Sequence, residues 1–129
     1  ENYFDLIIID DVFDWVSRET IFQSVTNIDN LLKEGGFIFI RDFYPDKNTK
    51  NQNHHVKDGS VYNFKVKNSH AGMFLASGIY EIEWQKIFFD KIGISTSYKC
   101  DNMFNYRWAD IILKKSYSGF FSESKQIKR

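Results

Sequence analysis

Two short apolar runs lie near the start of the chain, and an amphipathic segment separates them. The first run, 4–10, is rich in isoleucine and bounded by acidic residues, which is typical of a strand buried on both faces of a parallel sheet. Between the runs, apolar side chains recur at the spacing of one helix face; they are Ile21, Val25, Ile28, Leu31 and Leu32. The second run, 37–40, follows at once. The order strand, helix, strand predicts a right-handed βαβ unit with parallel strands.

The residues at both ends of the amphipathic segment are those that helix ends favour. Ser17 can cap the first turn, and Glu19 lies where a negative charge interacts favourably with the helix dipole. Lys33 is suited to the last turn, and Gly35 or Gly36 can adopt the left-handed conformation that commonly ends a helix. We therefore expect the helix to begin just after Ser17 and to end just before the glycine pair.

Beyond Arg41 the pattern changes to a long polar segment. Residues 42–68 contain the only proline and few apolar side chains, so we expect a long connection, either functional or mobile, with a short extended piece at 61–66. A short helix is predicted at 70–77, ended by Gly78.

Two further strands are predicted in the last third of the chain. Side chains at 80–88 alternate between two faces, which predicts a strand, with a helix as the rival. Residues 108–113 form a last apolar strand, which we expect to pair antiparallel because no crossover helix precedes it. Trp84 and Trp108 alternate with polar neighbours in these strands, and we expect both in the core.

Length and composition narrow the range of functions. The 129 residues suit one domain, here 1–116, followed by a polar tail at 117–129. Basic and acidic residues balance at 17 each, which argues against a nucleic-acid partner because duplex binders carry a basic face. A single cysteine rules out an intrachain disulfide, and no apolar run reaches the length of a membrane span, so we expect no membrane association and a cytoplasmic location.

A metal site is not expected from the histidines. His54, His55, Asp58 and His70 are the candidate ligands in the polar part of the chain. Adjacent histidines rarely bind one ion, and the spacing of the four matches no zinc pattern.

Four stretches, in this order, resemble the second half of a class I S-adenosylmethionine-dependent methyltransferase domain. They are FDLIIIDDVFDWV, NIDNLLKEGGFIFIRDF, ASGIYEIEWQKIFF and YRWADIILKK, and the most specific match is LLKEGG at 31–36. The similarity covers about 3–116. It implies an α/β fold with a partial Rossmann-like sheet, strand order 4-5-7-6 with the last strand antiparallel, and S-adenosyl-L-methionine as cofactor.

The chain departs from the family pattern in its first part. The glycine-rich turn after the family's first strand has no counterpart, nor has the acidic residue that ends its second strand. The chain does not begin with Met and reaches a strand by residue 4. We therefore expect the C-terminal half of the domain, inactive alone, with the missing N-terminal half as its partner.

Asp10 and Asp11 follow directly on the first predicted strand. In open α/β sheets, ligands bind beyond the carboxyl ends of strands, where the strand order reverses. By the resemblance, Asp10 binds the methionine end of the cofactor, and Asp11 is the catalytic carboxylate that orients and deprotonates the acceptor. The alternative is that both residues form a turn and cap, in which aspartate is common.

Aromatic side chains near these aspartates are candidates for an acceptor site. Phe13 and Trp15 wall the acceptor pocket or pack against the cofactor's cationic sulfonium; the alternative is that they pack in the core at the entry to the helix.

Residues after the second strand are further candidates for binding the acceptor. Arg41 either binds an anionic group of the acceptor or pairs with Asp42, and Tyr44 lies at the same end of the sheet. His54 and His55 lie on the long connection, which can carry a general base into the site as a lid.

The expected function is methyl transfer from S-adenosylmethionine to an oxygen or nitrogen of a small-molecule acceptor. Such a transfer needs aligned reactants rather than a nucleophile or metal motif. Two alternatives stay open. One is half of another nucleotide-binding enzyme, such as a nicotinamide-dependent oxidoreductase, which would continue with parallel strands. The other is a non-catalytic interaction module.

Overall fold

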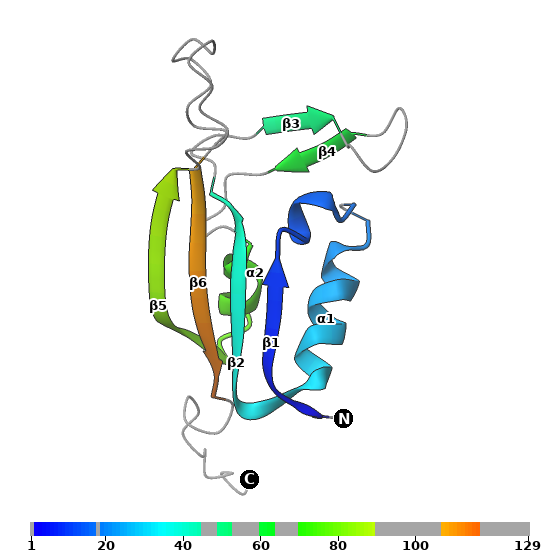
Figure 1. Ribbon diagram of the computed structural model, residues 1–129. Helices are drawn as coiled ribbons and strands as arrows, with labels where there is room; N and C mark the ends of the chain where they lie inside the picture. Colours follow the sequence, from blue (N-terminus) through cyan, green and yellow to red (C-terminus); the bar gives the residue numbers. More distant parts are fainter. Residues whose placement is uncertain are drawn as a thin grey trace, which may run out of the picture.

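The fold is a mixed α/β arrangement built on a four-stranded sheet, with a separate pair of short strands (Figure 1). The computed structural model describes residues 2–17, 19–44, 49–52, 60–63, 70–89 and 107–116. Among these residues, no helix is long and apolar enough to cross a membrane.

The first half of the chain forms the predicted parallel strand pair. Strand β1 (Phe4–Asp10) pairs in parallel with β2 (Leu32–Phe43), in a register that matches Leu6 with Phe37 and Asp10 with Arg41. Helix α1 (Ile21–Leu31) connects the two strands. Since parallel strands place their carboxyl ends at the same edge of a sheet, Asp10 and Arg41 end side by side.

The helix ends earlier than the glycine pair indicated, and the strand begins earlier. Phe4 pairs with Leu32, whereas Leu6 pairs with Phe37, so residues 33–36 bulge out of the ladder. Gly35 adopts a φ of +78°, and a side chain at Gly36 would come within 2.8 Å of the Lys33 carbonyl. The glycine pair therefore forms a bulge within β2, and the expectation that Lys33 lies in the last turn of the helix is wrong.

The start of the helix also differs from the prediction. Thr20 is the residue that precedes α1, and no side chain caps the helix there. Ser17 contributes its carbonyl oxygen, which accepts the N–H groups of Thr20 and Ile21. A short 3₁₀ turn, η1 (Phe13–Trp15), lies between β1 and this bend and was not predicted.

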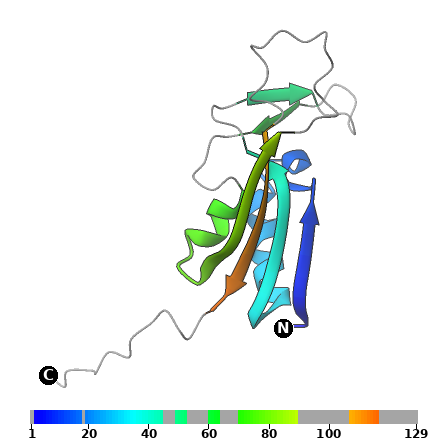
Figure 2. The same cartoon turned by 60° about the vertical axis from the view of Figure 1, so that its left-hand side comes forward.

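The second half of the chain adds an antiparallel strand to the interior of the sheet. Helix α2 (Ala71–Leu75) precedes β5 (Tyr80–Phe89), and Gly78, with a φ of +79°, forms the turn between them. Strand β6 (Arg107–Lys115) then lies between β2 and β5, antiparallel to both, so the order is β1-β2-β6-β5 (Figure 2). The strand predicted at 80–88 is confirmed over its helical rival.

The short strands form a separate antiparallel pair. They are β3 (Thr49–Gln52) and β4 (Ser60–Asn63). The pair lies beyond the carboxyl ends of β1 and β2 (Figure 1). The predicted extended piece at 61–66 thus overlaps β4, while β3 was not predicted.

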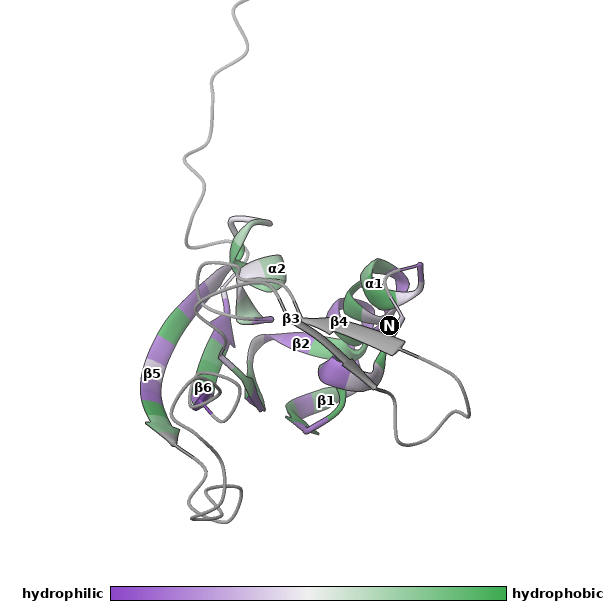
Figure 3. Ribbon diagram, turned by 90° about the horizontal axis from the view of Figure 1, so that it is seen from above, coloured by the Kyte–Doolittle hydropathy of each residue, from purple (hydrophilic) through white to green (hydrophobic). Residues whose placement is uncertain are grey.

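Both helices cover the same face of the four-stranded sheet (Figure 3). The core lies between them and the sheet. Its largest fully buried apolar side chains are Phe13, Leu32, Ile38, Ile40, Phe74, Ile111 and Leu113. These residues come from both halves of the chain, so the sheet and helices share one core.

A buried lysine in β6 joins this strand to the carboxyl end of α1. Lys115 in β6 donates hydrogen bonds to the carbonyls of Asp29 and Leu32, at 2.7 and 3.0 Å, and so satisfies acceptors at the carboxyl end of α1. Tyr80 in β5 donates to the Asp29 carboxylate at 2.5 Å. Burial raises the pKa of Tyr80, and the Asp29 carboxylate adds to this, so the phenol remains a donor.

The opposite face of the sheet carries exposed apolar side chains. Leu6 and Ile8 in β1, Phe37 and Phe39 in β2, and Ile112 in β6, with Glu83, line a shallow hollow of about 680 Å³. Ile8 is 64% exposed and Trp84 is 47% exposed, so the expectation that Trp84 lies in the core is wrong. The pairing of β5 shifts by one residue between Ile82 and Trp84, which interrupts the alternation seen in the sequence. Trp108 is half-buried and packs on Phe43, with ring centroids 4.3 Å apart.

Candidate functional site

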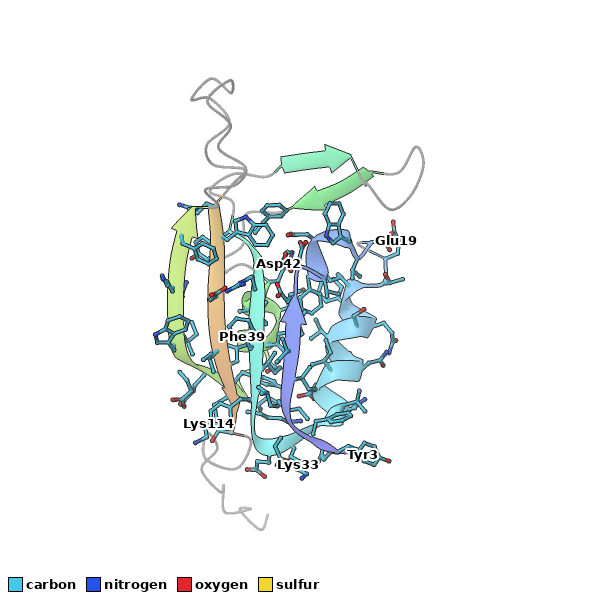
Figure 4. All side chains as sticks on the ribbon, viewed as in Figure 1. Tyr3, Glu19, Lys33, Phe39, Asp42 and Lys114 are labelled. Carbon is cyan, nitrogen blue, oxygen red and sulfur yellow. The ribbon has the colours of Figure 1, made fainter. Side chains whose placement is uncertain are left out.

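The candidate site lies where the carboxyl ends of β1 and β2 meet η1 and the start of α2. Asp42 is at this end of β2, beside β1 (Figure 4). Open α/β sheets bind ligands at this edge. The residues there fall into three groups: the turn after β1, a buried cluster of acids and histidine, and two arginine pairs.

Asp10 and Asp11 have different surroundings in the turn after β1. Asp10 is the last residue of the strand, and its side chain is exposed. Asp11 adopts a φ of +54°, in the left-handed region that aspartate tolerates better than most residues. Its N–H donates to the Arg41 carbonyl at 2.9 Å, and its Oδ1 accepts a hydrogen bond from the Trp15 indole at 3.1 Å. Asp11 therefore shapes the turn, and its catalytic role remains a prediction.

Phe13 and Trp15 are placed by the 3₁₀ turn. Phe13 is buried, and its ring lies 6.2 Å from that of Phe74 and 5.7 Å from that of His70. Phe13 is thus a core side chain that packs α2 against η1. Trp15 is partly buried and holds Asp11.

Asp14, Asp42 and His70 form a buried cluster that sequence reasoning did not select as a site. Asp14 is 2% exposed and Asp42 is 1% exposed, and the His70 side chain is 12% exposed. His70 Nδ1 lies 3.4 Å from Asp42 Oδ2 and 3.9 Å from Asp14 Oδ1. The cluster joins η1, β2 and the start of α2.

Backbone N–H groups hold both carboxylates in place. The Phe13 N–H donates to Asp42 Oδ2 at 3.1 Å. The Phe43 N–H lies 3.2 Å from Asp14 Oδ2 and 3.1 Å from Asp42 Oδ1. Asp14 Oδ1 and His70 Nδ1 are buried and have no hydrogen-bond partner in the described part of the chain.

The two carboxyl groups differ in protonation. Burial raises the pKa of Asp14 to about 10, and the adjacent Asp42 carboxylate adds to the shift. Burial also acts to raise the pKa of Asp42, but the contacts with His70 and Asp14 outweigh it and hold that pKa below its usual value. At neutral pH the pair therefore carries one proton, on Asp14, and one negative charge, on Asp42.

The arginine near the site is paired with an acid other than the one predicted. Arg41 binds Asp110 of β6 through two hydrogen bonds, at 2.7 and 2.8 Å, and not Asp42. Arg107 donates to the Tyr44 carbonyl at 2.6 Å and lies over the Tyr44 ring. The guanidinium of Arg41 is thus held by an acid, while its side chain stays 42% exposed.

The structure brings some of the predicted site residues together. Asp10, Asp11, Phe13, Trp15, Arg41 and Tyr44 all lie at the carboxyl edge of the β1–β2 pair. His54 and His55 lie outside the described residues. The signal for the missed cluster was present: one acid soon after the first strand, one at the end of the second, and a histidine opening the next helix. No single one of these is distinctive.

Comparison with known proteins gives one type of match. No family model matches the chain, and no curated protein sequence matches it. A solved structure from Leishmania major, described as a SAM-dependent methyltransferase of the DUF858 family, matches with a TM-score of 0.54 and 16% identity over 88% of this chain.

The aligned part is 39% of the Leishmania major chain, so this chain spans well under half the length of that protein. At this identity the likeness concerns the fold alone. The chain shares a mixed α/β fold with a SAM-dependent methyltransferase.

Proposed function

We propose that this chain is the C-terminal half of a S-adenosylmethionine-dependent methyltransferase domain, and that the whole domain methylates an oxygen or nitrogen of a small-molecule acceptor. The observation that carries the proposal is the sheet: two parallel strands joined by a helix, followed by an antiparallel strand inserted between β2 and β5. On this proposal β1, β2, β6 and β5 are the fourth, fifth, seventh and sixth strands of a Rossmann-like sheet. The match to a methyltransferase over 88% of the chain supports it.

The proposed cofactor site lies beyond the carboxyl end of β1. S-adenosylmethionine supplies an activated methyl group when bound. The exposed carboxylate of Asp10 is suited to bind the cofactor's ammonium group. Asp11, whose conformation is fixed by the Arg41 carbonyl and the Trp15 indole, is the acid proposed to orient the acceptor.

The proposed acceptor surface continues along the end of β2. The Arg41 side chain is partly exposed although Asp110 holds its guanidinium, so it can still meet an anionic acceptor group. Tyr44 lies at the same end, and His54 and His55 remain candidates for a general base.

Two features support a missing N-terminal half as partner. In the described part of the chain, β1 pairs only with β2, so its other edge carries no strand. Apolar side chains of the uncovered face, Ile8 and Trp84 among them, are exposed. Additional parallel strands beside β1 and a helix on this face would cover both.

Binding and activity measurements test the proposal. Calorimetric titration with S-adenosylmethionine should show no tight binding by residues 1–129 alone, and binding by the same residues with the preceding half of the domain. In that longer protein, Asp10→Asn should lower the affinity about tenfold or more, as expected when one charge-assisted hydrogen bond is lost. Asp5→Asn is the matched control, because Asp5 lies at the opposite end of β1. Tight cofactor binding by the 129 residues alone would contradict the truncation.

The oxidoreductase alternative has less support. A nicotinamide-dependent oxidoreductase is expected to continue with a parallel strand, whereas β6 runs antiparallel to both of its neighbours. Transfer of a hydride from a nicotinamide to the acceptor, with no methyl transfer, would favour it.

A further inference from the structure

The cluster of Asp14, Asp42 and His70 brings three possible metal-ligand atoms to one point. One ligand atom from each of the three residues lies within 4.8 Å of the other two. Each residue comes from a different element, namely η1, β2 and the residue that precedes α2. The site is therefore formed by the fold and not by a local turn.

Two buried atoms of the cluster lack hydrogen-bond partners, and one proton shared by the two acids does not give a partner to both. A proton between Asp14 and Asp42 links those two carboxyl groups. It leaves His70 Nδ1 buried without a hydrogen-bond partner, although two carboxylate oxygens face it. Asp14 Oδ1 is likewise unpartnered, on a side chain that is 1% exposed. One cation at the centre would be bound by all three atoms at once.

The spacing of the atoms fits a small divalent ion. A tetrahedral ion with bonds of about 2.0–2.2 Å holds its ligands about 3.3–3.6 Å apart. The His70–Asp42 separation of 3.4 Å meets this value, and the His70–Asp14 separation of 3.9 Å requires a shift of only a few tenths of an ångström.

The donor set selects a class of metal. One imidazole with two carboxylates suits Zn²⁺, Mn²⁺, Fe²⁺ or Co²⁺ better than Ca²⁺ or Mg²⁺, which prefer oxygen ligands alone. The N–H groups of Phe13 and Phe43 orient the carboxylates, as the outer partners of metal ligands do.

We propose that Asp14, Asp42 and His70 bind one divalent transition-metal ion that fastens η1 and α2 to the end of β2. The ion links three elements through buried ligands, and it therefore stabilises the edge of the sheet that carries the candidate site. This inference does not depend on methyltransferase activity.

Metal titration of the purified protein tests the inference. The protein is treated with EDTA, dialysed into metal-free buffer and titrated by calorimetry with Zn²⁺ and separately with Mn²⁺. We expect one equivalent to bind with a micromolar or lower dissociation constant, with a rise in melting temperature. With a water molecule as the fourth ligand, Co²⁺ should give the visible absorption bands of a four-coordinate site.

Two variants identify the ligands, and two others are controls. Asp14→Asn and His70→Gln keep the side-chain size, and each should weaken binding at least tenfold while the far-ultraviolet circular dichroism stays that of the wild type. Asp5→Asn, an exposed acid at the opposite end of β1, should bind the metal as the wild type does. A double variant, His54→Ala with His55→Ala, should also keep the wild-type affinity.

Three results would overturn the inference. One is a dissociation constant above a millimolar for both ions. Another is wild-type affinity in a folded Asp14→Asn or His70→Gln protein. The third is loss of binding in the double histidine variant, which would place the ion on that pair. If Asp14→Asn does not fold, His70→Gln, on a different element, decides the question.

Discussion

Lys115→Met is expected to destabilise the protein, because it removes a buried cation that joins α1 to β6. Lys115 is 7% exposed. Its ammonium donates to the Asp29 and Leu32 carbonyls at 2.7 and 3.0 Å and lies 3.1 Å from the Asp29 carboxylate. Methionine keeps a similar apolar stem, so the change removes the charge and its hydrogen bonds more than the packing.

The size of the effect follows from these contacts. Loss of one partner of a buried ion pair costs about 3–5 kcal/mol, and a hydrogen bond to a charged group contributes about 1.5–3 kcal/mol. The Asp29 side chain is 34% exposed, so water replaces part of the lost contact. We therefore expect a decrease of about 3 kcal/mol in the free energy of unfolding, at the low end of the range for buried pairs.

Urea unfolding followed by tryptophan fluorescence measures this loss. Lys33→Met is the matched control, because Lys33 is 46% exposed and its partner Asp5 is 85% exposed. An exposed pair contributes about 1 kcal/mol or less. If Lys115→Met and Lys33→Met shift the unfolding midpoint equally, with unchanged slopes, the Lys115 contacts do not hold α1 to the sheet.

Three other changes probe the core, the bulge and the buried cluster. Ile38→Ala, at a fully buried position, should lower the free energy of unfolding by about 2–5 kcal/mol in the same urea assay. Gly35→Ala should lower the free energy of unfolding by about 1 kcal/mol, because Gly35 has a positive φ. Gly36→Ala should lower it more, because a Cβ at Gly36 would lie 2.8 Å from the Lys33 carbonyl oxygen. Equal unfolding midpoints for the two variants would contradict the bulge. Asp42→Asn, measured in EDTA, should lower the free energy of unfolding by about 2–4 kcal/mol, because it removes the charged group that accepts two backbone N–H groups. A decrease below about 0.5 kcal/mol, which is typical of a surface substitution, would refute this.

The strand framework was predictable because each strand has a distinct local pattern. The run at 4–10 and the run at 37–40 are apolar throughout, and the helical spacing between them leaves parallel pairing as the simplest arrangement. The antiparallel strand near the end of the chain followed from the lack of a crossover helix before it.

The boundaries of α1 were less predictable, because tertiary contacts decide them. The sequence places Lys33 and Gly35 where a helix commonly ends, but Leu32 is fully buried in the core and already pairs with Phe4. Burial of Leu32 and the strand pairing thus end the helix before its glycines. Trp84 was misplaced for a related reason: alternation identifies two faces of a strand, but it does not show which face a helix covers.

The candidate site was predictable only as a region. Because ligands bind at the carboxyl ends of strands in open α/β sheets, the sequence predicted a site at Asp10 and Asp11. The cluster of Asp14, Asp42 and His70 depends on a 3₁₀ turn and on the position of α2, and neither follows from local sequence. These three residues are distant in sequence, and they come together only when the core packs.

The interior position of β6 has a consequence for how the protein is made. Of the strands that the structure describes, β6 is the last to be synthesised, and it lies between β2 and β5. Before then Phe37 lacks its pairing with Lys114, and β5 has no sheet partner. Until synthesis reaches β6, the nascent polypeptide exposes the edges of β2 and β5 that β6 later covers, and these edges are prone to self-association. A premature stop codon before Arg107 would therefore remove the centre of the sheet, not a dispensable end.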